Sequence, residues 1–197
     1  MDRALLARLA EVVDQATAAF DAYDYTTALE TTERFFWGFC DDYLELVKER
    51  AYAEEGGAET ASAKAALAVA LHVQLRLLAP FLPYVTEEVW SWWQDGSVHL
   101  TTWPEAGEVG GAEADPTLLD LVAGALTGIR GAKSQAKASM RAPLRLVEIS
   151  GTPAQLAAIE SARADLCKAG KVSGELVLVP VDDATELTVR AELAPAE

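Results

Sequence analysis

Apolar residues in the first part of the chain recur every three or four positions, which is the period of an α-helix. Residues 3–23 are predicted to form an amphipathic helix with an apolar face of Leu5, Leu9, Val12, Ala16 and Phe20. Asp24 suits the N-cap of a second helix, which follows at once and ends near Arg50. So short a connection favours antiparallel packing of the two helices.

The second helix is apolar around most of its circumference. One stripe is formed by Leu29, Phe36, Cys40, Tyr43 and Val47. Phe35 and Phe39 form another stripe beside it, and Trp37 belongs to neither. Other helices must cover such a helix, because exposed aromatic side chains are costly in water. We therefore expect it in the middle of a bundle, with its charged end, Asp41 to Arg50, in solvent.

Two more helices are expected before the pattern changes. A third covers about residues 59–79, and a shorter fourth follows Pro80 and Pro83. Their inward-facing residues are predicted to be Leu67, Leu71, Leu75 and Leu78 in the third and Val85, Val89, Trp90 and Trp93 in the fourth. Residues 1–104, ending in an extended segment from Gly96 to Pro104, thus predict an antiparallel helical bundle.

The remainder of the chain predicts a second domain. Residues 105–115 are rich in glycine and acids, which is typical of a linker. Residues 116–197 are predicted to be a small α+β domain, with helices over about 116–138 and 153–170, a strand over 144–149, and a hairpin of strands 172–181 and 186–193. The expected fold class is mainly α: an antiparallel helical bundle followed by a small α+β domain.

Composition narrows the class of protein. A hydrophobic fraction of 51% excludes general disorder. Cys40 and Cys167 lie far apart without metal-ligand spacing, so they predict core residues in a reducing compartment rather than a disulfide. His72 and His99 add no zinc pattern. No leader and no apolar run of bilayer-spanning length are evident, so we expect a cytoplasmic protein that does not enter a membrane.

The formal net charge of −15 means that any nucleic-acid binding needs a local basic patch. Such a patch exists, because no acidic residue lies between Leu121 and Val147. That segment contains Arg130, Lys133, Lys137, Arg141 and Arg145. At about 3.6 residues per turn, the first four lie on one helix face, which predicts contacts with a phosphate backbone. The alternative is a solvated face that pairs with acids elsewhere on the chain.

No catalytic constellation is recognisable. Gly110-Gly111 lacks the lysine and the strand–turn–helix context of a nucleotide-binding loop. Asp41, Asp42 and Glu45 are read as a solvated helix end, and His72 as a packed or surface histidine. We predict no catalytic residue, metal site or cofactor in this chain. Three tryptophans outside the core stripes are candidates for base stacking, namely Trp37, Trp92 and Trp103, although packing on the bundle is the favoured role of Trp103.

Three motifs in order resemble valyl-tRNA synthetases, a family of class I aminoacyl-tRNA synthetases. They are FWGFCDDYLELVK at residues 36–48, LAPFLPYVTEEVW at residues 78–90, and GSVH at residues 96–99 with Trp103-Pro104. Residues 129–143 are similar to the helix and turn that follow the bundle in the same family. The resemblance covers about residues 20–104 and points to the C-terminal, anticodon-binding region of these enzymes.

The resemblance implies that the bundle binds the anticodon stem and loop of the valine tRNA. With the resemblance, Leu44, Glu45 and Lys48 are the candidates for contact with the anticodon. The full predicted RNA-binding set adds Arg50, the off-stripe Trp37, and four cations of the acid-free segment, namely Arg130, Lys133, Lys137 and Arg141. A glutamate accepts hydrogen bonds from exocyclic amines of bases, and lysine neutralises phosphate. The class I catalytic motifs, the Rossmann core and the editing domain are absent. ATP with magnesium would therefore act only in the missing catalytic domain. The resemblance thus implies two partners, the valine tRNA and that catalytic domain, and we expect the chain to be a monomer.

Two functions remain open at this point. The chain is either the tRNA-binding part of a valine–tRNA ligase, or a free-standing paralogue that acts as a protein-interaction or regulatory module without RNA binding. The dependence of tRNA affinity on salt separates the two, because phosphate contacts release counterions.

Overall fold

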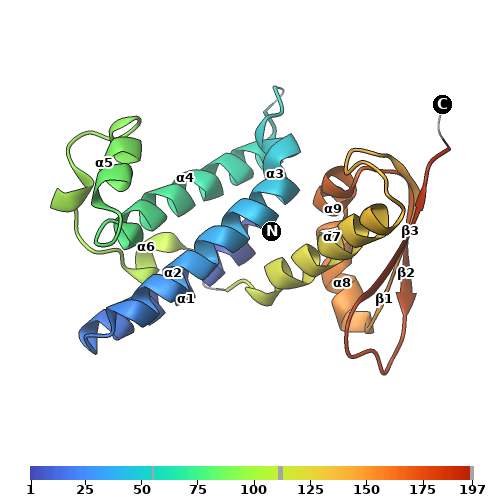
Figure 1. Cartoon of the computed structure of the whole chain (residues 1–197), viewed down its shortest axis with the longest axis horizontal. Coiled ribbons are helices and arrows are strands. Elements are labelled where there is room, and N and C mark those ends of the chain that lie inside the picture. The colour runs from blue at the N-terminus through green and yellow to red at the C-terminus, as the bar shows by residue number, and fades with distance from the viewer. Residues whose placement is uncertain (55, 111–112, 196–197) are drawn as a thin grey trace. The chain divides into compact units, whose positions relative to one another are not determined.

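The computed structural model describes residues 1–54, 56–110 and 113–195, and the chain divides into two compact units (Figure 1). The first unit comprises residues 1–42 and 53–116. The second comprises residues 43–52 and 117–197. The fold is mainly helical with one small sheet, as the sequence predicts. The last turns of the second predicted helix, however, belong to the second unit and not to the bundle.

The first unit is built from helices. They are α1 (Asp2–Asp21), α2 (Tyr25–Gly38), α4 (Ala58–Leu78), α5 (Pro83–Ser91) and α6 (Ala106–Val109), with a 3₁₀ turn at Val98–Leu100. α1 packs against α2, α4 and α6, and α4 also packs against α5. Leu5 and Leu9 of α1 are fully buried, which confirms the predicted face of this helix.

The interior of the first unit relies on small residues. Ala63, Ala66 and Ala70 of α4 are buried, whereas Leu67 and Leu71, predicted to face inward, are only half-buried. Leu75 of the predicted face is buried, and Leu71 packs against the core cluster that contains Leu75. The prediction was therefore right for part of the face and left out the alanines, which let two helix backbones approach closely and which a pattern of large residues overlooks.

By length and composition alone, α4 is long and apolar enough to cross a membrane, with a mean hydropathy of 1.2. This contradicts the expectation that no apolar run of the chain is long enough to span a bilayer. α4 packs against α1, α2 and α5 within the unit. Buried core helices of globular domains can have the same length and hydropathy.

The second helix contains a π-helical turn that the sequence did not predict. Asp24 caps α2 by accepting a hydrogen bond from the Thr27 backbone N–H at 3.0 Å. The chain continues through a π-helix (Phe39–Tyr43) into α3 (Leu44–Ala51). Phe35 and Phe39 are buried in the first unit, whereas the predicted stripe residue Phe36 is half-buried. A single apolar stripe of constant period cannot describe both α2 and α3, because the π-helical turn between them holds an extra residue.

The segment after α5 is packed onto the helices. The Trp103 indole N–H donates to Thr17 Oγ1 at 2.8 Å, and the Trp103 and Phe20 rings meet edge to face at 5.1 Å. Packing is therefore the confirmed role of Trp103. The predicted linker contains α6, which is held on α4 by the ion pair between Arg76 Nη2 and Glu108 Oε1 at 2.8 Å. Residues 111 and 112 of that linker lie outside the described residues.

The second unit is a three-stranded sheet covered by helices. Besides α3 it contains α7 (Thr117–Gln135), β1 (Leu144–Gly151), α8 (Pro153–Ser161), α9 (Arg163–Gly170), β2 (Val172–Pro180) and β3 (Thr188–Leu193). α7 packs against β3, and α8 and α9 pack against β2, so the helices gather on one face of the sheet (Figure 1). Val147 and Ile149 of the central strand are fully buried beneath them.

The strand order is β2-β1-β3, so the predicted hairpin of the last two strands is wrong. β1 lies between them, parallel to β2 and antiparallel to β3. The helices α8 and α9 connect β1 to β2 as a βαβ crossover, which places β2 beside β1 in the parallel direction. β3 then pairs with the other edge of β1.

Two glycines allow close approaches in the second unit. A Cβ atom on Gly128 of α7 would lie 2.7 Å from the Val189 Cβ of β3. A Cβ atom on Gly174 of β2 would overlap the backbone carbonyl of Arg145 in β1, beside the shift of register in this strand pair. A glycine inside a strand often marks such a bulge.

Candidate nucleic-acid interface

α3, which carries most of the predicted anticodon-contacting residues, is fixed to α9 by ion pairs. Arg50 Nε donates to Asp165 Oδ1 at 2.9 Å, and the two residues are only 8% and 9% exposed. Glu49 of α3 also pairs with Lys171, which directly follows α9. Arg50 is therefore committed to the interior of the unit. A contact between Arg50 and RNA, which the sequence suggested, does not fit this position.

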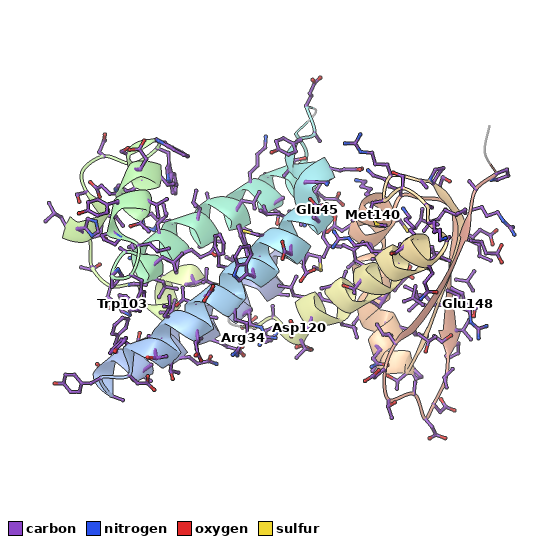
Figure 2. All side chains as sticks on the ribbon, in the orientation of Figure 1. Arg34, Glu45, Trp103, Asp120, Met140 and Glu148 are labelled. Atoms are coloured by element: carbon purple, nitrogen blue, oxygen red, sulfur yellow. The ribbon has the colours of Figure 1, made fainter. Side chains whose placement is uncertain are left out.

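The outer side of α3 presents a small charged cluster. Glu45 Oε2 lies 2.7 Å from Lys48 Nζ and 3.7 Å from Arg130 Nη2 of α7. The Glu45, Lys48 and Arg130 side chains are each between 35% and 42% exposed, and Leu44 is half-buried beside them. The structure thus brings together one predicted base-reading acid and two predicted phosphate-binding cations in the second unit. Figure 2 labels Glu45 on α3.

Lys133 is not part of a basic helix face. It is 2% exposed, and its Nζ donates to the carbonyl of Met140 at 3.0 Å and to that of Gly170 at 2.9 Å. Burial and the nearby charge of Lys171 lower the pKa of its ammonium group. The expectation that Lys133 contacts phosphate is therefore not met by its position.

α7 also ends earlier than predicted, at Gln135. Lys137 has a left-handed φ of 52°, and the Ala138 N–H donates to the Lys133 carbonyl at 2.9 Å, which is the pattern of a helix C-cap. Lys137 and Arg141 consequently lie beyond the helix, in residues 136–143, which we call the basic turn. The prediction that four cations share one helix face is wrong, because this left-handed residue terminates the helix.

The tip of the basic turn is a β-turn stabilised by a serine. The Ala142 N–H donates to the Ser139 carbonyl at 2.9 Å, and the Arg141 N–H donates to Ser139 Oγ at 3.2 Å. Lys137 and Arg141 are both exposed. Within the described residues neither is paired with an acid, whereas Arg145 of β1 pairs with Glu192 of β3. The basic turn therefore presents two cations to solvent from an ordered backbone.

Two of the candidate stacking residues are exposed in the first unit. Trp37 of α2 is 54% exposed, and its indole N–H donates to Glu33 Oε1 at 3.4 Å. Trp92, at the end of α5, is 70% exposed and donates to Glu88 Oε1 at 3.2 Å. Both residues are exposed enough to be candidates for stacking on a base.

The histidines and cysteines lie in packed or ordinary surroundings. His72 stacks near Trp90 with ring centroids 4.9 Å apart, and burial, with the charge of Arg76, lowers its pKa. The Cys40 and Cys167 thiols are half-buried, and burial raises the pKa of each. In the part of the chain that the structure describes, no group of three or more His, Cys, Asp or Glu residues is arranged to hold a metal ion.

Sequence reasoning missed the residues that anchor α3. Asp165 and Lys171 lie more than a hundred positions from their partners Arg50 and Glu49, since these pairs are separated by 115 and 122 residues. No local pattern signals such a pairing.

Comparison with known proteins defines the class. The chain matches the family described as the anticodon-binding domain of tRNA ligase over residues 2–148, and it belongs to this family. The matched region includes α2, α3, α7 and the basic turn, and therefore all of the candidate RNA-contacting residues. It ends within β1.

The similar proteins then point to one ligase. The chain is 58% identical over 199 residues to the valine--tRNA ligase of Thermobifida fusca (strain YX), covering 100% of this chain. It is 52% identical over 188 residues to that of Salinispora tropica, covering 87% of the chain, and 50% identical over 194 residues to that of Cutibacterium acnes, covering 98%. The chain spans 22% of the length of each of these relatives. The resemblance to valyl-tRNA synthetases is confirmed.

Proposed function

We propose that this chain is the tRNA anticodon-binding part of a valine--tRNA ligase. The observation that carries the proposal is the placement of four cations in one unit of a strongly acidic chain, two of them exposed and two half-buried beside Glu45. Lys137 and Arg141 project from the basic turn, and Arg130 and Lys48 flank Glu45. An acidic surface repels RNA elsewhere, so these cations define where a phosphate backbone binds. Membership in the anticodon-binding family supports the same assignment.

The candidate residues of the second unit divide into two roles. Lys48, Arg130, Lys137 and Arg141 neutralise phosphates, which gives affinity without sequence preference. Glu45 accepts a hydrogen bond from an exocyclic amine of an anticodon base, with Leu44 beside it as an apolar contact. Trp37 belongs to the first unit and is a separate candidate for stacking on a base. Lys133 and Arg50 are left out of this set, because both are buried.

The chemistry of the whole ligase lies outside this chain in the proposal. The complete enzyme would join valine to its tRNA with the use of ATP and magnesium in a catalytic domain, acting in the cytoplasm. That domain is the second partner of this chain. The alternative of a regulatory module without RNA binding gains no support from the three relatives described above, each of which is a valine--tRNA ligase.

The test is the affinity of the chain for a valine tRNA transcript, measured by fluorescence anisotropy between about 50 and 200 mM salt. Four phosphate contacts predict a slope of about −3 to −4 in a plot of log affinity against log salt. Replacing Lys137 and Arg141 by alanine is expected to make the slope less negative by about 1.4 to 1.8, since each contact contributes about 0.7 to 0.9.

A matched control keeps the net charge of that double variant. Arg3→Ala with Lys64→Ala removes two exposed cations from the first unit and is expected to leave the slope unchanged. Absence of binding at 50 mM salt would refute the proposal. An equal effect of the two double variants would show that net charge, rather than the basic turn, governs binding.

A further inference from the structure

Lys133 occupies an unusual position for a lysine in a basic segment. Its side chain is 2% exposed, although neighbouring cations of the same segment project into solvent. Burying an ammonium group is unfavourable unless hydrogen-bond partners replace the lost water. The partners here are two main-chain carbonyls, those of Met140 and Gly170, at 3.0 and 2.9 Å. The ammonium group therefore links the basic turn to the end of α9.

The Met140 carbonyl has a specific place in the basic turn. It belongs to the central peptide of the β-turn from Ser139 to Ala142, so it directly precedes Arg141. Rotating this peptide by half a turn would give the other common turn type, which requires a left-handed φ at Arg141. Arg141 does not have a positive φ. The bond from Lys133 thus fixes the orientation of the peptide that aims Arg141.

The main chain of Lys133 contributes to the same arrangement. Its carbonyl accepts the Ala138 N–H at 2.9 Å, which stabilises the left-handed Lys137 at the end of α7. Glycine is the usual residue at such a position, because other side chains are strained there. The conformation of the turn is therefore held by hydrogen bonds to Lys133 and Ser139, and not by a glycine.

We propose that Lys133 is a positioning residue for RNA binding: its buried ammonium group holds the basic turn in the conformation that presents Arg141 to a phosphate. This inference rests on the proposed function and adds a residue that does not itself touch RNA. The lowered pKa of Lys133 agrees with a buried group, and a direct phosphate contact conflicts with its exposure.

A double-mutant cycle between Lys133 and Arg141 tests the coupling. Lys133→Met keeps an unbranched apolar side chain and removes the ammonium group. Arg141→Ala is expected to weaken tRNA binding about tenfold at 50 mM salt, which corresponds to one phosphate contact, and Lys133→Met alone should cause a similar loss. The double variant should show no further loss, because Arg141 acts only when the turn is held.

The contrary outcomes are distinct. A loss of about a hundredfold in the double variant would mean that the two residues act independently, which would overturn the positioning role. Unchanged affinity in Lys133→Met would overturn it as well. If Lys133→Met does not unfold cooperatively, Lys133→Gln, which keeps an amide donor at a shorter reach, takes its place in the cycle.

A second measurement works without RNA and separates this inference from the proposed function. NMR order parameters of the Arg141 and Ala142 amides are expected to fall from about 0.85 to below about 0.6 in Lys133→Met, while those of β1 stay unchanged. Rigid turn amides, or an equal loss of order in β1, would overturn the inference. A wild-type chain that binds no tRNA would refute the proposed function, and the order parameters would still decide whether Lys133 holds the turn.

Discussion

The ion pair of Arg50 and Asp165 gives the most demanding prediction about the second unit. Arg50→Met leaves the Asp165 carboxylate, 9% exposed, without its guanidinium partner. Removing one member of a buried pair typically costs about 3–5 kcal/mol, because the remaining charge stays desolvated. In a unit of roughly 90 residues, this corresponds to a fall of about 12 °C or more in the midpoint of thermal unfolding.

The assay must report on the second unit alone. All five tryptophans lie in the first unit, so tryptophan fluorescence does not monitor the helix α3 or the sheet. Hydrogen exchange measured by mass spectrometry on peptides from α3 and α9 reports the loss directly. The matched control is Arg190→Met, because the pair of Arg190 with Glu148 is 3.9 Å long and its arginine is 80% exposed. We expect the control to cost less than about 1 kcal/mol.

A compensated variant sharpens the test. Arg50→Met combined with Asp165→Leu replaces both charges by apolar groups and should recover most of the lost stability, since no buried charge remains. Equal and small losses for Arg50→Met and Arg190→Met would refute the conclusion that this pair fixes α3. If Arg50→Met kept full stability and lost tRNA binding, Arg50 would be an RNA contact after all.

Three further outcomes follow from the described contacts. Glu45→Gln should reduce the preference for the valine anticodon over other anticodons by about tenfold, measured by competition binding, and an equal loss for all tRNAs would contradict base reading. Gly174→Ala should lower the unfolding midpoint sharply, seen by circular dichroism, because its Cβ would overlap the Arg145 carbonyl. Burial opposes ionisation of Glu108, but hydrogen bonds from Arg76 and from a backbone N–H outweigh it and hold the pKa below its ordinary value of 4.5. That stabilisation exists above pH 4.5 and is lost as the pH falls through the lowered pKa, so Glu108→Gln should be less stable at pH 7 and flatten the acid limb of a stability–pH curve.

The helical half of the fold was accessible from the sequence where one period holds along a whole helix. Leu5 and Leu9 illustrate this, since both are fully buried on the predicted face of α1. In the second predicted helix the buried side was not predicted along the whole length, because the π-turn at Phe39–Tyr43 adds a residue. No residue type indicates such a turn. Periodicity therefore predicted the helices better than it predicted which side of each helix is buried.

The error in the sheet has a different origin. The strand beginning at Val172 and the strand ending at Leu193 are separated by a short acidic turn, which locally resembles a hairpin. The strand–helix–strand order from Leu144 to Pro180 predicts a parallel pair with equal force, since crossover connections through helices place strands side by side. The sequence thus contained a hairpin signal and a crossover signal. Only the structure decides between them, because β1 pairs with β2 on one edge and with β3 on the other.

In the candidate site, too, the sequence pattern did not show which residues are buried. The absence of acids between Leu121 and Val147 marked the segment that contains the cations, but it did not predict the turn within that segment. It was not enough to separate Lys133, which is buried, from Lys137, which is exposed, because that difference depends on where α7 ends. The end is set by a left-handed lysine, a residue that composition does not mark as a helix stop.

In the proposed function, charge pairing leaves so acidic a chain with a surface on which RNA can bind. In the second unit, acids pair with Arg145 and Lys171, which reduces the local positive potential around the sheet and α9. Lys137 and Arg141 have no acidic partner within the described residues, and they are exposed on a turn whose backbone is already ordered. Repulsion from the rest of the surface then disfavours other orientations of the RNA. The acidic body therefore restricts how a tRNA can bind and leaves affinity to a few cations, so we expect weak binding by this chain alone and a strong dependence on salt.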